Sequence, residues 1–382
     1  MIVKNARCVF GDGIREGMEI AVEDGRIVAV REATDDKGRG DIDVSGHYLA
    51  PGFIDLHVHG AMGRDTMEAS TDSFRAICEY HATGGTTSLL LTTATAPVDE
   101  IVAVLRAMRA NRGALPQIAG AHVEGPFISK EKPGAQRSEF IRNPDAETVG
   151  RFLEHSEIVR RITLAPEVPG AIEAIRSFYS AGMSVSGGHS NAWDEEARAA
   201  FECGMRSVTH TFNCMSSARR RGVERVAGLL EFALSEPKIS CELIADGHHV
   251  SPTLMKMLLR AKSVAGICLV TDATAGAGLP DEASFSLAGR PCVVRGGVCL
   301  LADGSGLAGS ASRMIDLVRV MVRQVGLSVH EAIRMATDNP ARAIGLHRKG
   351  RLEIGADADF VVLSEDLKVV RTFIAGQEIF HL

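Results

Sequence analysis

Apolar and polar residues alternate along the chain in two different rhythms. In residues 1–50, short stretches carry an apolar residue at every second position and are separated by turn signals such as Asp24-Gly25. Residues 350–363 and 369–380 repeat this alternation near the other end of the chain. We therefore expect both chain ends to form one small β domain, with a different unit inserted between them.

The middle of the chain alternates apolar strands with helix-like segments. Amphipathic stretches such as 72–85, 98–113 and 193–204 separate the strands, and glycines often follow them, as is typical of helix C-caps. The predicted strands are 53–58, 86–92, 117–123, 161–166, 183–187, 205–210, 239–245 and 266–271. Eight strands that alternate with helices favour a parallel (β/α)8 barrel.

The predicted architecture is thus an α/β protein with a TIM-like barrel and a small β-sandwich. We expect residues 1–50 and 345–382 to form the β-sandwich domain and residues 51–344 to form the barrel. Residues 283–300 have the turn-rich pattern of a hairpin insertion that precedes the last two helices.

Composition excludes several classes of protein. The formal net charge is −6 without a basic tail or stripe, which argues against nucleic-acid binding. The apolar runs are far shorter than the roughly 20 residues of a membrane helix, and the N-terminus lacks the apolar core of a signal peptide. Eight cysteines without C-x-x-C spacing indicate reduced thiols rather than disulfides or a structural zinc site. We expect a cytoplasmic protein.

The first predicted barrel strand lies in the sequence GFIDLHVHG, residues 52–60. Because side chains along a strand point alternately to opposite faces, Asp55, His57 and His59 share one face. Two imidazoles about 7 Å apart on one strand face can converge on a single ion near the end of the strand. Two hydrogen-bonded structural histidines would produce the same motif, so the motif alone leaves both interpretations open.

Other metal-ligating residue types occur at the ends of later predicted strands: Glu124 after the third, His189 after the fifth, His210 after the sixth and Asp272 after the eighth. Taken singly, each has an ordinary structural explanation, such as a helix cap or a hydrogen-bonded core histidine. In a parallel barrel, however, the carboxyl ends of all strands open onto one face, and that face carries the active site. Six such residues at one face indicate a metal centre.

The residue types restrict the metal. Imidazole nitrogen and carboxylate oxygen suit Zn²⁺ and, less exclusively, Fe²⁺, Mn²⁺ or Co²⁺. No cysteine occurs among the six positions, which disfavours a closed structural zinc site. Four histidines and one carboxylate can hold two ions with Glu124 between them. We therefore expect one or two divalent ions, with zinc as the first choice.

Eight short motifs follow one another in the order of a known family: PGFIDLHVHG, GGTTS, GAHVEGPF, GGHSNA, VTHTFNCM, IADGHHV, LVTDAT and LAGS. In these motifs the chain resembles the amidohydrolase superfamily and, within it, the N-acetylglucosamine-6-phosphate deacetylases. The resemblance runs over nearly the whole chain. It implies a metal-dependent barrel, a β-sandwich built from both chain ends, an amino-sugar phosphate substrate and a homodimer with active sites near the interface.

The resemblance also assigns roles to the metal-ligating positions. Glu124, His189 and His210 match the main metal ligands of the family. His57 and His59 match positions that bind a second metal in some members and are replaced in others.

Further matches imply a phosphate-binding region. Asn213 and the backbone around Cys214 match it directly, and His249 matches a substrate-binding histidine near the phosphate. The family's phosphate-binding arginine lies in an R-E-P-G stretch and partly reaches across the dimer, whereas this chain has SSARRRGVERVAG there. By position we choose Arg221, and Arg225 is the alternative if the extra residues shift the loop. An ordinary solvated loop would have a similar composition.

Two departures from the family pattern concern the substrate. The family normally has K-G-A-H after EGPF, but KEKPGAQRSE places Gln136 at the position of that histidine, which helps to orient or polarise the acyl carbonyl. Gln136 keeps an N–H donor but cannot carry a positive charge. The second departure is the loop of residues 219–221, which lacks R-E-P-G. Neither departure affects the metal, so a different N-acyl amino sugar or sugar phosphate is the alternative substrate.

The chemistry that these residues support is amide hydrolysis. A bound Zn²⁺ lowers the pKa of its water to about 7 and polarises a carbonyl oxygen. Asp272 matches the family's catalytic acid/base and is also an expected metal ligand; it would accept the water proton and return it to the leaving amine. We expect N-acetylglucosamine 6-phosphate to be hydrolysed to glucosamine 6-phosphate and acetate. A non-catalytic protein on the same barrel is the remaining hypothesis, but such proteins generally lose one of these six positions.

Overall fold

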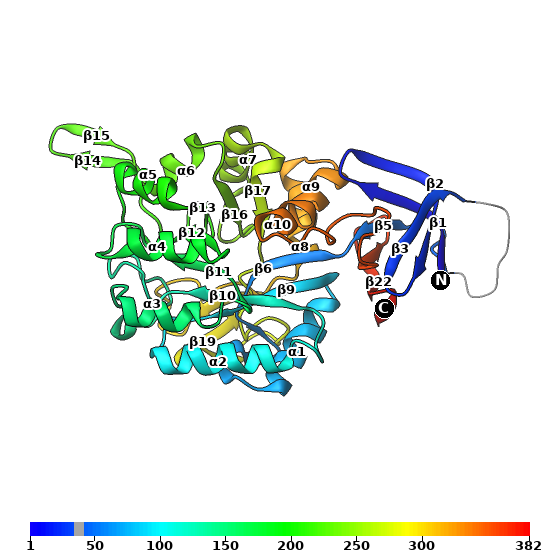
Figure 1. The fold of residues 1–382 in the computed structure, drawn as a ribbon. Helices are drawn as coiled ribbons and strands as arrows, with labels where there is room; N and C mark the ends of the chain where they lie inside the picture. The colour runs from blue at the N-terminus through cyan, green and yellow to red at the C-terminus, as the bar shows by residue number, and fades with distance from the viewer. Residues whose placement is uncertain (34–41) are drawn as a thin grey trace.

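The computed structural model describes residues 1–33 and 42–382. Its central sheet contains eight parallel strands: β6 (Phe53–Val58), β9 (Thr86–Thr93), β10 (Ile118–Glu124), β11 (Val159–Leu164), β12 (Ser184–Gly187), β13 (Met205–Val208), β16 (Ser240–Leu243) and β17 (Ile267–Leu269). They are arranged in the order β17-β16-β13-β12-β11-β10-β9-β6 (Figure 1). All eight strands predicted from the sequence are confirmed.

The two outer strands of this order meet beyond the end of β17. The backbone N–H of Asp272 donates to the carbonyl of His57 at 3.0 Å, and that of His59 donates to the carbonyl of Ala273 at 2.8 Å. These bonds bring the first strand beside the segment that follows the last strand. The sheet therefore closes into a barrel, and the residues that follow β6 and β17 lie next to each other at its mouth.

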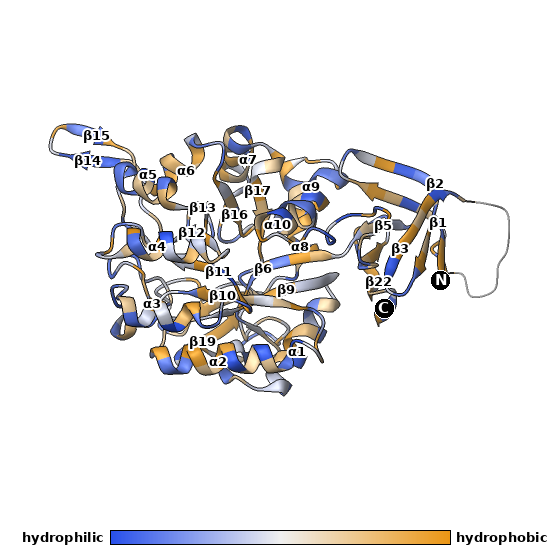
Figure 2. Cartoon of the chain, in the orientation of Figure 1, coloured by the Kyte–Doolittle hydropathy of each residue, from blue (hydrophilic) through white to orange (hydrophobic). Residues whose placement is uncertain are grey.

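Helices surround the barrel (Figure 1): α1 (Thr71–Ala82), α2 (Val98–Asn111), α3 (Ala146–Leu153), α4 (Ala171–Ser180), α5 (Asp194–Cys203), α6 (Leu229–Ser235), α7 (Pro252–Lys262), α8 (Met314–Val320), α9 (Val329–Met335) and α10 (Asp338–Ala343). In α2, the buried residues Ile101, Leu105 and Met108 lie at spacings of four and three, which places them on one face. Figure 2 shows hydrophobic and hydrophilic segments alternating along this helix. The helices predicted near 72–85, 98–113 and 193–204 are confirmed.

Both ends of the chain contribute to a second sheet beside the barrel (Figure 1): β1 (Ile2–Phe10), β2 (Gly13–Glu23), β3 (Arg26–Glu32), β4 (Ile42–Asp43), β5 (Tyr48–Pro51), β21 (Phe360–Leu363), β22 (Val369–Ile374) and β23 (Gln377–His381). Strand β5 pairs in parallel with β1 and antiparallel with β21, so it joins the two chain ends. The predicted fold class, a barrel with a small β unit from both ends, is confirmed. Residues 34–41 of the predicted N-terminal part lie outside the described residues.

Two smaller β elements leave the barrel. β18 (Ser284–Leu287), β19 (Arg290–Arg295) and β20 (Val298–Leu301) form an antiparallel sheet, as the hairpin pattern of 283–300 predicts. β14 (Arg219–Arg221) and β15 (Glu224–Val226) form a hairpin that projects from the barrel on the side away from the chain-end sheet (Figure 1). The arginine-rich loop is therefore a protruding ribbon.

The cysteines are free thiols, as their spacing in the sequence predicts. All eight are free and six are buried: Cys8, Cys78, Cys241, Cys268, Cys292 and Cys299. None of the helices in the described residues has the length and apolar character that a membrane span requires.

The chain-end sheet has a core of its own, and its centre can be tested. Phe360 and Phe373 are fully buried there and stack with ring centroids 4.7 Å apart. Phe373→Ala should lower the free energy of unfolding by about 3–5 kcal/mol, because it removes a buried ring and leaves a cavity. Urea unfolding monitored by circular dichroism measures the change. Ile354→Ala is the control, since this side chain is 70% exposed; equal midpoints for the two variants would contradict this core.

Candidate active site

Five potential metal ligands converge at the mouth of the barrel. His57 lies on β6 and His59 directly follows it, Glu124 ends β10, and His189 and His210 follow β12 and β13. All five side chains are buried, and their ligand atoms form two groups in which the atoms lie within 4.8 Å of one another. One group is His57, His59 and Glu124, and the other is Glu124, His189 and His210. Glu124 is thus the member that both groups share.

The donor atoms of the cluster face one another. Glu124 Oε1 lies 3.2 Å from Nε2 of both His189 and His210, and Glu124 Oε2 lies 3.1 Å from His59 Nε2. The Nε2 atoms of His189 and His210 are 3.1 Å apart, and so are those of His57 and His59. Two neutral imidazoles whose lone pairs meet at this distance repel each other, whereas a cation between them accepts both lone pairs. The donor set therefore fits divalent metal ions.

The electrostatics of the cluster lead to the same conclusion. Burial is the largest single effect and would lower the pKa of His57 and His189, but the charge of Glu124 and the further charges and hydrogen bonds around each ring together raise both pKa values well above their usual range. Burial would raise the pKa of Glu124, yet positive charge on the same two histidines holds it well below its usual value. The buried carboxylate thus requires positive charge beside it, which a metal ion also supplies.

The hydrogen bond that one ring nitrogen of a histidine donates determines which nitrogen is left to bind a metal. His189 Nδ1 donates to the carbonyl of Lys132 at 2.9 Å, and His210 Nδ1 donates to that of Asn213 at 3.2 Å. A histidine that donates its Nδ1–H in this way presents the Nε2 lone pair to an ion. His57 differs, because its Nδ1 faces a side chain, which is described below.

The backbone turns sharply where these side chains enter the site. His189, His210 and Asp272 have positive φ angles of 46°, 31° and 50°. Residues with a side chain rarely adopt this left-handed conformation, and it concentrates at functional sites. Each of the three residues lies within three positions of the end of its barrel strand, so the turn places the side chain at the mouth.

A cavity of about 340 Å³ lies over the cluster. Nine of the eleven residues proposed from the sequence line it: His59, Glu124, Gln136, His189, His210, Asn213, Cys214, His249 and Asp272. His57 is fully buried and does not line the cavity. The remaining residue, Arg221, also does not line it.

Two of the lining residues have well-defined partners. The side-chain amide of Gln136 donates to Glu124 Oε2 at 2.6 Å and accepts from the backbone N–H of Thr95 at 2.6 Å. Gln136 therefore contacts a potential metal ligand directly and retains a second N–H. His249 Nδ1 lies 2.7 Å from Asp246 Oδ2, and this bond raises the pKa of His249 although burial alone would lower it. A protonated His249 would suit an anionic group.

Arg221 lies on the projecting hairpin and is already engaged there. It forms an ion pair with Glu195, and its guanidinium lies 4.8 Å from the centroid of the Trp193 ring. A different arginine, Arg290 of β19, lines the cavity and donates from Nη1 to the carbonyl of Gly134 at 3.2 Å. The sequence gives no signal for Arg290, because its place depends on how the hairpin insertion folds over the mouth.

Comparison with known proteins identifies the family. Residues 48–379 match the model of the amidohydrolase family. The chain belongs to this family. The N-acetylglucosamine-6-phosphate deacetylase of Lysinibacillus sphaericus is 34% identical to it over 381 residues, which cover 99% of this chain and 97% of that protein. The N-acetylgalactosamine-6-phosphate deacetylase of Escherichia coli O157:H7 is also 34% identical, over 98% of each protein.

A solved structure gives the same result for this amidohydrolase. The crystal structure of N-acetylglucosamine-6-phosphate deacetylase from Pasteurella multocida superposes with a TM-score of 0.93 at 33% identity, covering 99% of this chain and 98% of that one. The resemblance inferred from eight short motifs is confirmed. The chain is therefore an amidohydrolase, a hydrolase of carbon–nitrogen bonds, with a site that fits divalent metal.

The ligand set can be tested through metal content. His189→Ala removes one of the three ligands in the group of Glu124, His189 and His210, so the purified variant should contain at least one metal equivalent less than the wild type. Inductively coupled plasma mass spectrometry measures this. The matched control is His347→Ala, which changes an exposed histidine outside both groups. Equal metal content in the two variants would show that His189 is not a ligand.

Proposed function

We propose that this amidohydrolase removes the N-acetyl group of N-acetylglucosamine 6-phosphate and releases glucosamine 6-phosphate and acetate. The observation that carries the proposal is the buried Glu124 shared by two histidine pairs, in a chain 34% identical over 99% of its length to a deacetylase of this substrate. A second candidate substrate is N-acetylgalactosamine 6-phosphate, because a deacetylase named for it is equally identical. The two sugars differ only in the configuration of one hydroxyl group.

We propose Zn²⁺ as the metal, because nitrogen and oxygen donors without a thiolate suit it. Glu124, His189 and His210 would hold one ion, and His57 and His59 would hold a second ion with Glu124 between the two. When bound, such an ion lowers the pKa of a water molecule and polarises the acyl carbonyl. Gln136 would keep Glu124 in place through its hydrogen bond and direct its free N–H toward the acyl group.

Asp272 is the proposed acid/base. Its Oδ1 lies 3.4 Å from His57 Nε2 and 3.5 Å from His59 Nε2, and its side chain is 14% exposed. It is thus more accessible than the buried ligands and reaches both the cluster and the cavity. Asp272 would accept a proton from water and then transfer it to the nitrogen of the amine, which must be protonated to leave.

The protruding hairpin supports a homodimer. Val223 at its tip is 92% exposed, and an isolated two-stranded ribbon is only marginally stable without further packing. Contact with a second copy would cover the hairpin and bring its arginines toward another active site, as the family resemblance predicts for Arg221.

We also propose a cytoplasmic location, which agrees with eight cysteines of which none forms a disulfide.

The proposed role of Asp272 predicts that a substitution at this residue lowers turnover without removing the metal. Asp272→Asn keeps the size of the side chain but removes its basicity, so kcat should fall by about 10²-fold or more. The metal content should stay close to that of the wild type, because the histidines and Glu124 remain. Acetate release from N-acetylglucosamine 6-phosphate and metal analysis of the same preparation measure both. A kcat near the wild-type value would exclude Asp272 as the acid/base.

Phosphate recognition can be assigned to one of two arginines. We propose that Arg290, which lines the cavity, contacts the phosphate within the same chain. Arg290→Gln should raise KM for the phosphorylated sugar by about 10-fold or more, since hydrogen bonds between charged groups contribute roughly 1.5–3 kcal/mol. Hydrolysis of unphosphorylated N-acetylglucosamine should not change. Arg221→Gln is the matched comparison; a KM increase confined to this variant would instead favour an arginine that reaches across the dimer.

A further inference from the structure

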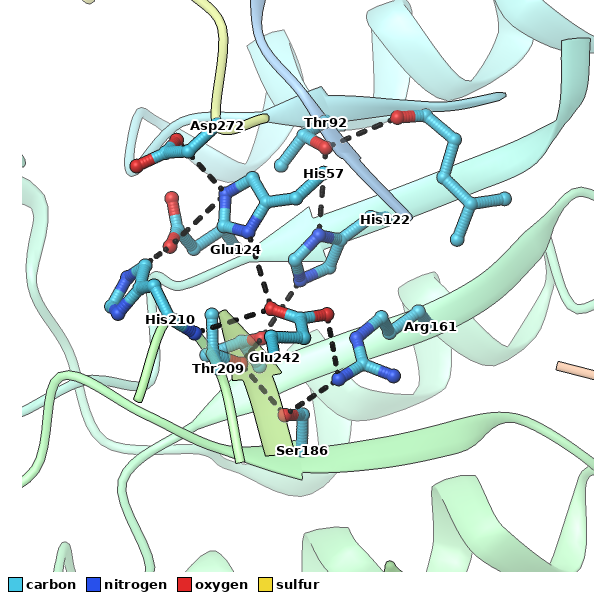
Figure 3. A network of polar contacts seen from close by, with 12 residues as sticks. His57, Thr92, His122, Glu124, Arg161, Ser186, Thr209, His210, Glu242 and Asp272 are labelled. Atoms are coloured by element: carbon cyan, nitrogen blue, oxygen red, sulfur yellow. Dashed lines mark hydrogen bonds and ion pairs between the residues drawn. The ribbon is translucent and has the colours of Figure 1, made fainter. Parts of the chain in front are cut away.

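A buried ion pair lies beneath the metal-binding cluster. Arg161 on β11 and Glu242 on β16 have side-chain exposures of 0% and 1%, and Arg161 Nη2 lies 2.8 Å from Glu242 Oε1 (Figure 3). The interior of a parallel barrel is normally filled with branched apolar side chains. A buried ion pair often contributes no more stability than apolar residues of the same volume would. Its presence in this barrel therefore suggests a role other than stability.

The pair contacts one potential metal ligand. The second oxygen of Glu242, Oε2, lies 3.5 Å from His57 Nδ1 and also accepts from the backbone N–H of His210 at 3.3 Å. His57 Nδ1 is fully buried and has no hydrogen-bond partner in the described part of the chain. The Glu242 carboxylate is thus the acceptor placed to receive its N–H. Figure 3 shows Glu242 between His57 and Arg161.

A layer of hydroxyl groups fixes the pair from the other side. Arg161 donates to Ser186 Oγ at 3.0 Å and to Ser184 Oγ at 3.3 Å. Ser186 Oγ lies 2.7 Å from Thr209 Oγ1, which lies 2.7 Å from Thr163 Oγ1. Because the guanidinium is planar and its donors point in fixed directions, these contacts restrict the orientation of Arg161 beside Glu242.

The two halves of the cluster are therefore oriented by different means. The Nδ1 atoms of His189 and His210 lie against main-chain carbonyls, which are part of the fold and need no charged partner. The Nδ1 atom of His57 lies instead against the side chain of Glu242, and Glu242 lies against Arg161. Glu242 also accepts from the main chain of His210, but it does not contact the ring of that residue. A change in the ion pair should consequently affect the His57 half of the cluster more strongly than the other half.

We propose that Arg161 and Glu242 are positioning residues for the ion held by His57 and His59. Glu242 accepts the Nδ1–H of His57, so the lone pair of Nε2 points toward Glu124 and Asp272, and Arg161 holds Glu242 in place. The inference rests on the proposed metal centre and concerns only its His57–His59 half. Outer partners of this kind typically change metal affinity by about 10–100-fold.

Two double variants test the inference. Arg161→Met/Glu242→Leu removes both charges and the acceptor, and a buried ion pair replaced by apolar residues usually still permits folding. Arg161→Met/Glu242→Gln removes the charges but keeps an acceptor oxygen opposite His57. The control is Thr163→Val, which changes the same polar layer at a hydroxyl whose partners are His122 and Thr209 and not a ligand. Each protein is loaded with Zn²⁺, and its metal equivalents and affinities are measured by mass spectrometry and by competition with a chromogenic chelator.

The wild type and Thr163→Val should bind two equivalents. The Leu double variant should keep most of its affinity for the first ion and bind the second about 10–100-fold more weakly, and the Gln double variant should recover most of that loss. The inference is wrong if the Leu variant binds both ions as the wild type does, if it loses both equally, or if the wild type binds a single ion.

A second measurement needs no variant. Nitrogen NMR of the histidine rings in zinc-loaded wild-type protein should show His57 protonated at Nδ1 and metal-bound at Nε2. The opposite arrangement would overturn the inference even if the double variants fail to fold. Normal binding of both ions without deacetylation of either N-acetylhexosamine 6-phosphate would instead refute the proposed function and leave the positioning role intact.

Discussion

The site depends on one buried carboxylate that requires positive charge on two sides. Glu124 ends strand β10 with 1% of its surface exposed, and the two histidine pairs come from strands on either side of β10 in the sheet order. A bare carboxylate in such a place is strongly unfavourable, and it is stabilised only by ionised or metal-bound neighbours. The four histidines surround this carboxylate. The cavity lies above them, and the ion pair of Arg161 and Glu242 lies below them.

The topology of the barrel brings the histidines to Glu124. Every strand is parallel, so the residues that follow the strands meet at one face regardless of their distance in the chain. Histidines that follow β12 and β13 thereby reach a carboxylate on β10 and a histidine pair at the end of β6. Closure between β6 and the segment after β17 places Asp272 beside this pair. The candidate metal ligands therefore come from the barrel strands and the residues that directly follow them.

Segments added to the barrel form the other part of the cavity wall. The hairpin insertion contributes Arg290 to the cavity wall, and the β14–β15 ribbon carries the arginine-rich run away from it. Two relatives that share 34% identity with this chain are named for different sugars. Gln136 lies where the two parts meet, because it lines the cavity and donates to Glu124.

The sequence by itself determined the barrel strands, the small β unit from both chain ends and the candidate ligands. The physical reason is local: period-two alternation defines strands and their faces, and residues at the carboxyl ends of parallel strands must share one mouth. The segment CELI, residues 241–244, places the charged Glu242 within an apolar strand. This pattern could also have predicted a buried charge. Its partner Arg161 could not be named from this signal, because their contact depends on the register between strands that are not neighbours in the barrel. Only the tertiary structure decided that Arg290 lines the cavity and Arg221 does not, because the reach of a hairpin is set by its packing and not by its sequence position.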